Sequence, residues 1–191
     1  MRVEPRYALS WNEITGRPDP AWLSDDDARA AYESPQGTLI VVDGSTPLTP
    51  GDKRAVRAAW RIRFTPDGLV RVSWMDEHGS VLRQSYLETT DDRLFRTRIT
   101  DRTYPDGARR WLMYEARVRR TLEFHPDGTI FIDVHRPGQV EVERGVTTGD
   151  ESAWWLDRPS FGRWDDLLHP GFGLPADDPG LDPRLAQAWG A

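Results

Sequence analysis

The amino-acid sequence predicts a mainly β protein: an antiparallel meander of about seven or eight strands, forming either a bent sheet or a barrel. Two observations predict this class, a Pro-Asp-Gly turn that recurs along the chain and stretches of alternating apolar and polar residues between the turns. We expect short helices and an irregular, Pro/Gly/Trp-rich C-terminal wrap around the meander. The 191 residues fit a single domain, 1–191, made of an N-terminal helix and strand segment (1–56), the β-meander (57–146) and a wrapping tail (147–191).

The recurring turn lies at residues 64–68, 103–107 and 124–128. In each copy Pro presets φ, Asp caps the turn locally, and Gly accepts the positive φ that follows. Each copy therefore predicts a hairpin with a type I turn followed by a bulge. The glycines are 39 and 21 residues apart, and residues 89–92 supply a fourth turn in the longer gap. The result is a repeat with a period of about 20 residues.

Between the turns, apolar and polar residues alternate with a period of two, which is typical of antiparallel strands with one buried and one wetter face. The alternating stretches are residues 58–64, 69–74, 94–99, 111–119, 130–135 and 140–143. Each is expected to be a strand of the meander.

The flanking segments have other patterns. Ser24 followed by three aspartates predicts an N-cap and a helix that continues through Tyr32. Residues 39–42 are apolar and β-branched and predict a strand, whereas residues 50–57 fit either a short helix or the start of the next strand. From Trp154 onward the tail has little periodicity but many aromatic anchors. We expect it to wrap the sheet and to end in a short helix at residues 183–189; the alternative is a mobile lid.

Composition excludes several classes of site. The chain has 25 basic and 31 acidic residues, a formal net charge of −6, and no cysteine, so thiolate metal sites, disulfides and cysteine nucleophiles are absent. No apolar run approaches the length of about 20 residues that spans a membrane, and no signal peptide is visible. We expect a cytoplasmic protein that has no membrane association, no cofactor and no metal.

Charge is distributed unevenly. Residues 57–120 carry 14 basic and 9 acidic residues, whereas residues 121–191 carry 5 basic and 13 acidic residues. Arginines at alternate positions of the predicted strands share one face, together with Trp111: Arg61, Arg63, Arg71, Arg96, Arg98, Arg117 and Arg119. Such a face suits an anionic or aromatic ligand. The alternative is that these arginines pair across strands with Glu88, Glu115 and the acidic tail.

The residues expected to bind such a ligand are Arg61, Arg63, Trp74, Arg96, Arg98, Trp111 and Arg117. Nucleic acid is not an expected partner, because a chain with a net charge of −6 lacks the basic field that nucleic-acid binding uses.

The sequence contains no strong catalytic motif. His135 is the best candidate base among four histidines, because Asp133 lies two residues before it on the same strand face. If the protein is an enzyme, the candidate catalytic residues are His135, Asp133, Glu115, Tyr114 and Tyr86. The alternative interpretation is a solvated strand face of ordinary charged pairs.

The aromatic–x–Pro-Asp-Gly hairpins, with strands such as residues 108–111 after the turn, resemble MORN-type hairpin repeats over residues 58–135. The most similar variant is that of bacterial antitoxin or immunity modules paired with polymorphic toxins. This resemblance implies a non-catalytic binding role and names no site residue.

Two functions from different classes follow. The first is a non-catalytic binding protein, in its most specific form an immunity or antitoxin-like protein whose acidic ends bind a basic protein partner. The second is a cofactor-free β-barrel enzyme (a cyclase, isomerase or hydrolase) or a carrier, acting on a hydrophobic or anionic small metabolite.

Overall fold

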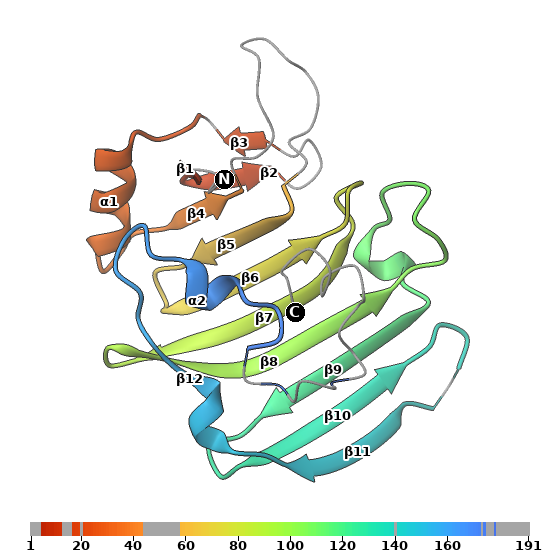
Figure 1. Cartoon of the computed structure of the whole chain (residues 1–191). Helices are drawn as coiled ribbons and strands as arrows, with labels where there is room; N and C mark the ends of the chain where they lie inside the picture. The colour runs from red at the N-terminus through yellow and green to blue at the C-terminus, as the bar shows by residue number, and fades with distance from the viewer. Residues whose placement is uncertain are drawn as a thin grey trace.

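A computed structural model describes residues 5–12, 17–19, 21–43, 58–139 and 141–172, together with residues 174 and 178. Its main feature is a ten-stranded antiparallel sheet in which neighbours follow the order β1-β4-β5-β6-β7-β8-β9-β10-β11, with β12 paired to β8. Figure 1 shows these strands succeeding one another across the sheet, from the orange β4 to the blue-green β11. The predicted mainly β meander is confirmed.

The N-terminal segment supplies one edge of the sheet and a helix. Its strands are β1 (Arg6–Ala8), β2 (Ser10–Asn12), β3 (Arg17–Asp19) and β4 (Leu39–Val42), and β2 and β3 form a separate two-stranded sheet. Helix α1 (Asp25–Glu33) begins as predicted after Ser24, whose Oγ accepts a hydrogen bond from the Asp27 N–H at 3.2 Å. Residues 50–57, which fitted either helix or strand, lie outside the described residues.

Four strands form the centre of the sheet. They are β5 (Trp60–Phe64), β6 (Leu69–Met75), β7 (Val81–Thr90) and β8 (Arg93–Thr103). The predicted hairpin between β5 and β6 is present: the Gly68 N–H donates to the Thr65 carbonyl, and Gly68 has a φ of +78°. The predicted turn at residues 89–92 joins β7 to β8, with Asp91 at a φ of +54°.

The third part of the sheet departs from the prediction. Its strands are β9 (Val118–Phe124), β10 (Thr129–His135) and β11 (Glu143–Thr148), with a 3₁₀ helix, η1, at Met113–Glu115. The expected strand at 111–119 and the expected hairpin at 103–107 are therefore wrong. Tyr104 is buried and its hydroxyl donates to the Val81 carbonyl, while the Trp111 N–H donates to Ser80 Oγ. These bonds hold the long β8–β9 connection against the start of β7 instead of allowing a tight turn.

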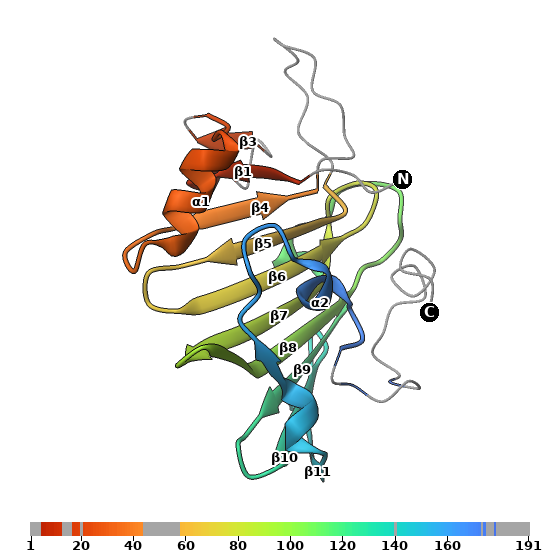
Figure 2. The ribbon, with the colours of Figure 1, turned by 60° about the vertical axis from the view of Figure 1, so that its left-hand side comes forward.

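The sheet does not close into a barrel, so that alternative is wrong. Its two ends, β1 and β11, are not paired with each other, and every residue of β11 is exposed. Figure 2 shows the twisted sheet with α2 (Asp165–Leu168) lying over one of its faces, while β12 (Trp155–Asp157) is paired with β8 within the sheet. The tail covers the apolar surface that a closed barrel would bury by wrapping on itself.

The described part of the tail wraps the sheet, as expected. Two buried residues of α2, Leu167 and Leu168, and Trp164 before it join the largest core cluster with residues of β5 to β7. The Trp74 indole N–H donates to the Leu168 carbonyl at 3.0 Å. We call this covered side the tail face and the opposite side the pocket face. The helix expected at residues 183–189 lies outside the described residues.

Candidate functional site

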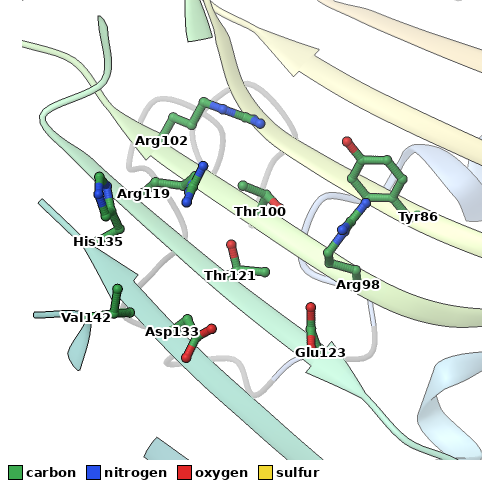
Figure 3. Close-up of a pocket in the computed structure, with 10 residues that line it drawn as sticks. All are labelled: Tyr86, Arg98, Thr100, Arg102, Arg119, Thr121, Glu123, Asp133, His135 and Val142. Atoms are coloured by element: carbon green, nitrogen blue, oxygen red, sulfur yellow. The ribbon is translucent and has the colours of Figure 1, made fainter. Parts of the chain in front are cut away.

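A polar pocket of about 360 Å³ opens on the pocket face of the sheet, over β7 to β10 (Figure 3). It is lined by Tyr86, Arg98, Thr100, Arg102, Arg119, Thr121, Glu123, Asp133, His135 and Val142. Strand register brings these residues together, because alternate residues of a strand point to one face. We call this site the arginine pocket.

The register explains the layout of the arginine pocket. Arg102 lies opposite Arg119 across β8 and β9, and Thr100 lies opposite Thr121 one step along the same face. Arg119 in turn lies opposite His135 of β10. In Figure 3 the two threonines form the middle of the floor, with Arg102 and Arg119 at one end.

Arg102 is the most unusual residue of the pocket. Only 9% of it is exposed, and its Nε and Nη1 are buried with no hydrogen-bond partner. Burial lowers the pKa of this guanidinium, and the Arg119 cation acts in the same direction. A buried donor without an acceptor is costly in free energy, so Arg102 has unused hydrogen-bonding capacity.

The opposite end of the arginine pocket has mixed charge. The Arg98 guanidinium stacks over the Tyr86 ring, with Cζ 4.2 Å from the ring centroid. Glu123 is exposed and lies opposite Arg98 in the β8–β9 register. Asp133 is 3.5 Å from the Arg144 Nε of β11, so its charge is already compensated. The free positive charge is therefore concentrated at the Arg102 and Arg119 end.

The five candidate catalytic residues are divided by the structure. His135, Asp133 and Tyr86 all line the arginine pocket. Tyr114 lies in η1 with 81% of its surface exposed, and Glu115 accepts hydrogen bonds from Arg109 and the Leu112 N–H. The β8–β9 connection thus holds these two residues outside the pocket. Among the described residues, no hydrogen bond joins His135 to Asp133.

The residues expected to bind a ligand are spread more widely. Only Arg98 of that set lines the arginine pocket. On the same face, Arg61 is buried over the Trp11 ring, with Cζ 5.6 Å from its centroid, whereas Arg63 is exposed. Trp74 is part of the core on the tail face. Trp111 and Arg117 belong to the β8–β9 connection and to no strand.

Arg96 lies on the opposite face from Arg98, which corrects the predicted shared face. A β-bulge between β7 and β8 leaves Thr97 with no residue opposite it in the strand register, so Leu87 lies opposite Arg96 while Tyr86 lies opposite Arg98. Arg96 therefore turns into the core beneath the tail, with Cζ 4.9 Å from the centroid of the Phe172 ring. Complete burial lowers the pKa of Arg96 to about 9, with Arg83 as a second cause.

Five pocket residues were not singled out from the sequence as site residues: Thr100, Arg102, Thr121, Glu123 and Val142. Arg102 has the same strand parity as Arg98, so extending the predicted strand from residue 99 to 103 would have found it. The alternating stretch that predicted this strand stopped at Ile99, before the turn expected at 103–107. Arg119 was included in the predicted arginine face but not among the expected ligand contacts.

On the tail face, a buried ion network fixes the tail to the sheet. Arg83, whose side chain is fully buried, donates to Asp101 at 2.6 and 3.0 Å and to Asp178 at 3.1 Å. Arg120 donates to the other oxygen of Asp178 at 2.7 Å. Burial raises the pKa of Asp101, while Arg83 acts in the opposite direction. The charges here are compensated, in contrast to those of Arg102.

Within the described ranges, no group of three His, Asp or Glu residues could hold a metal ion. No helix among those described is long and apolar enough to cross a membrane.

Comparison with known proteins gave no match to a family model, a curated protein or a solved structure. The resemblance to MORN-type repeats therefore stays a prediction.

Proposed function

We propose that the protein is a non-catalytic binding protein for a small anionic ligand, a carboxylate or a phosphate, held in the arginine pocket. The observation that supports this most is the pair Arg102 and Arg119. They lie opposite each other in the β8–β9 register, and two nitrogens of the buried Arg102 guanidinium have no partner.

An anion at this end of the pocket offsets two contributions that make the free energy of the folded protein less favourable. Like charges directly opposite each other on neighbouring strands are destabilising. A buried guanidinium without acceptors adds a desolvation cost. A carboxylate or phosphate between Arg102 and Arg119 compensates both cations and supplies oxygen acceptors. The hydroxyls of Thr100 and Thr121, on the pocket floor, are further donors for the same anion.

Binding fits this geometry better than acid–base catalysis. A histidine that acts as a general base is normally oriented by a carboxylate on its other ring nitrogen. Asp133 instead lies 3.5 Å from Arg144, and no described residue forms a hydrogen bond with the His135 ring. His135 therefore adds polarity to the pocket wall without a partner that would prepare it for proton transfer.

Isothermal titration calorimetry with inorganic phosphate and with acetate, at low ionic strength, tests this function. We expect saturable binding of one anion, weakened about 10- to 100-fold by Arg119→Gln and by Arg102→Gln, because hydrogen bonds to charged groups contribute about 1.5 to 3 kcal/mol. Arg117→Gln is the matched control: Arg117 is exposed, two residues away, and outside the pocket. Equal affinities for all variants would contradict the proposal.

A second candidate is the immunity or antitoxin-like role. The observation that favours it is an exposed apolar stretch in the β8–β9 connection, where Leu112, Met113 and Tyr114 are 45%, 49% and 81% exposed. Exposed neighbouring apolar side chains are typical of protein-binding surfaces. The test is co-expression with toxic proteins encoded by neighbouring genes. This role is supported if the parent protein protects the host cell from such a toxin and the variant with serine at all three positions does not. It is contradicted if the parent protein gives no protection.

A further inference from the structure

A second hollow of about 660 Å³ adjoins the arginine pocket on the same face. The two share Tyr86, Arg98 and Glu123 at their boundary, and we call the two hollows together the groove. The second hollow has an apolar wall made of Leu69, Phe95, Phe124, Pro126 and Trp155. We call this part the apolar end of the groove.

The β-bulge at Thr97 explains why the apolar end exists. After the bulge, β8 pairs with β9, beginning at Arg98 opposite Glu123. Before the bulge, β8 pairs with β12 instead, and Trp155 lies opposite Phe95. The Phe95 and Trp155 rings are 4.8 Å apart between centroids. The change of partner strand thus places a tryptophan from the tail beside the groove.

Charge separates the two ends of the groove. The apolar end is lined by two exposed carboxylates, Glu88 and Glu123, which repel an anion, and by one guanidinium, Arg98, which it shares with the arginine pocket. Arg102 and Arg119 lie at the far end, where positive charge is in excess. A ligand whose charge lies near these arginines and whose apolar part lies toward Trp155 would satisfy both ends.

We propose that the ligand is an amphiphile: a phosphate or carboxylate head bound by Arg102 and Arg119, with an alkyl or aryl part seated against Trp155, Phe95 and Pro126. This inference rests on the proposed function, since the head is the anion of the arginine pocket. The ligand is a free molecule and not a membrane surface, because Glu88 and Glu123 would face an anionic bilayer.

The experiment is a titration of the full chain with inorganic phosphate and with methyl, hexyl and dodecyl phosphate as monomers. Phe95 lies seven residues before Arg102 on β8, about 20 Å at the rise of a strand, so only the dodecyl chain is long enough to approach Trp155. The head is constant in this series, and only the apolar part grows. We expect the affinity to tighten most between hexyl and dodecyl phosphate, by up to about fourfold for each methylene that is buried at the apolar end. Trp155→Leu should reduce this dependence on chain length and leave the affinity for inorganic phosphate unchanged. Trp22→Leu, a partly buried tryptophan outside the groove, is the matched control.

The outcomes separate the two proposals. If phosphate binds but chain length has no effect, the amphiphile is wrong and the anion-binding function stands. If chain length has the same effect in Trp155→Leu as in the parent, the apolar part binds elsewhere and the inference is overturned. If neither phosphate nor any alkyl phosphate binds, both proposals fail. Co-sedimentation with phosphatidic acid vesicles, without binding of monomeric hexyl phosphate, would overturn the assignment to a free molecule.

Discussion

Arg102 and Arg119 lie directly opposite each other on β8 and β9, on the face of the sheet that the tail does not cover. Two cations in this relationship repel each other, and no described carboxylate forms an ion pair with Arg102. The next pair along the two strands, Asp101 and Arg120, points to the tail face and is part of a compensated network. The same two strands therefore carry one compensated and one uncompensated charge cluster.

The first prediction concerns stabilisation by an anion. At a phosphate concentration ten times the Kd, binding adds about 1.4 kcal/mol to the free energy of unfolding and raises Tm by about 3 to 6 °C. Differential scanning calorimetry in phosphate, compared with chloride at equal ionic strength, measures this shift. Arg119→Gln should lose most of it, whereas a shift of the same size in that variant would mean that phosphate binds elsewhere.

The second prediction concerns Arg96, a buried cation whose Nη1 has no partner. Replacing it with methionine keeps the length of the side chain and removes the desolvated charge. We expect Arg96→Met to be as stable as the parent or more stable, by up to about 3 kcal/mol, as when buried charges are replaced by apolar residues. Urea unfolding measures this. Arg98→Met, at an exposed position beyond the bulge, should change stability by less than about 1 kcal/mol.

The third prediction concerns the network that holds the tail. Asp101→Asn leaves the fully buried Arg83 side chain with one charged carboxylate partner, Asp178, instead of two. We expect the free energy of unfolding to fall by about 3 to 5 kcal/mol, the usual cost of removing one partner of a buried ion pair. Asp157→Asn is the control, because that side chain is 96% exposed and lies 3.6 Å from Arg93. Equal and small effects of both variants would contradict a structural role for the network.

The fourth prediction concerns Tyr104 at high pH. Burial raises its pKa to about 12 from the ordinary value of 10.0. Its contribution to stability is therefore complete below pH 10 and is lost as pH rises toward 12, because the phenol ionises first in the unfolded state. The full loss is about 2 to 3 kcal/mol for a shift of this size.

Tyr104→Phe tests this fourth prediction. The variant should be less stable than the parent by about 1 kcal/mol at neutral pH, since it loses the hydrogen bond to the Val81 carbonyl. Urea unfolding between pH 9 and 11.5 should show the difference shrinking and then changing sign. A difference that stays constant over this range would mean that Tyr104 is not protected from ionisation. Tyr114→Phe, at an 81% exposed position, is the control.

Much of the sheet could be predicted from the sequence because alternation and turn chemistry are local signals. The Thr65–Gly68 turn and the start of α1 at Ser24 depend on residues within a few positions, and both were predicted. The β8–β9 connection was not predicted, because it depends on the contacts of Tyr104 and Trp111 with β7 and the residue before it. A Pro-Asp-Gly pattern alone does not contain that information.

The candidate site was predicted only in part, because the bulge and the long-range strand pairing that shape it leave no local signal in the sequence. Four residues named from the sequence, His135, Asp133 and Tyr86 as candidate catalytic residues and Arg98 as a candidate ligand contact, line the arginine pocket together. Arg96 was assigned to the same face because strict alternation was assumed, and one bulged residue, Thr97, reverses it. The pairing of β12 with β8 likewise connects residues about 60 positions apart and leaves no local pattern.

The most direct test of the central claim observes the two arginines themselves. Nuclear magnetic resonance of the arginine Nε–Hε groups, with Arg102 and Arg119 assigned by Arg102→Gln and Arg119→Gln, follows them during titration with hexyl phosphate. We expect both resonances to move and to saturate with a single Kd, while the resonance of Arg117 stays in place. Movement of Arg117 to the same extent, without saturation at Arg102 and Arg119, would contradict an anion site in the arginine pocket.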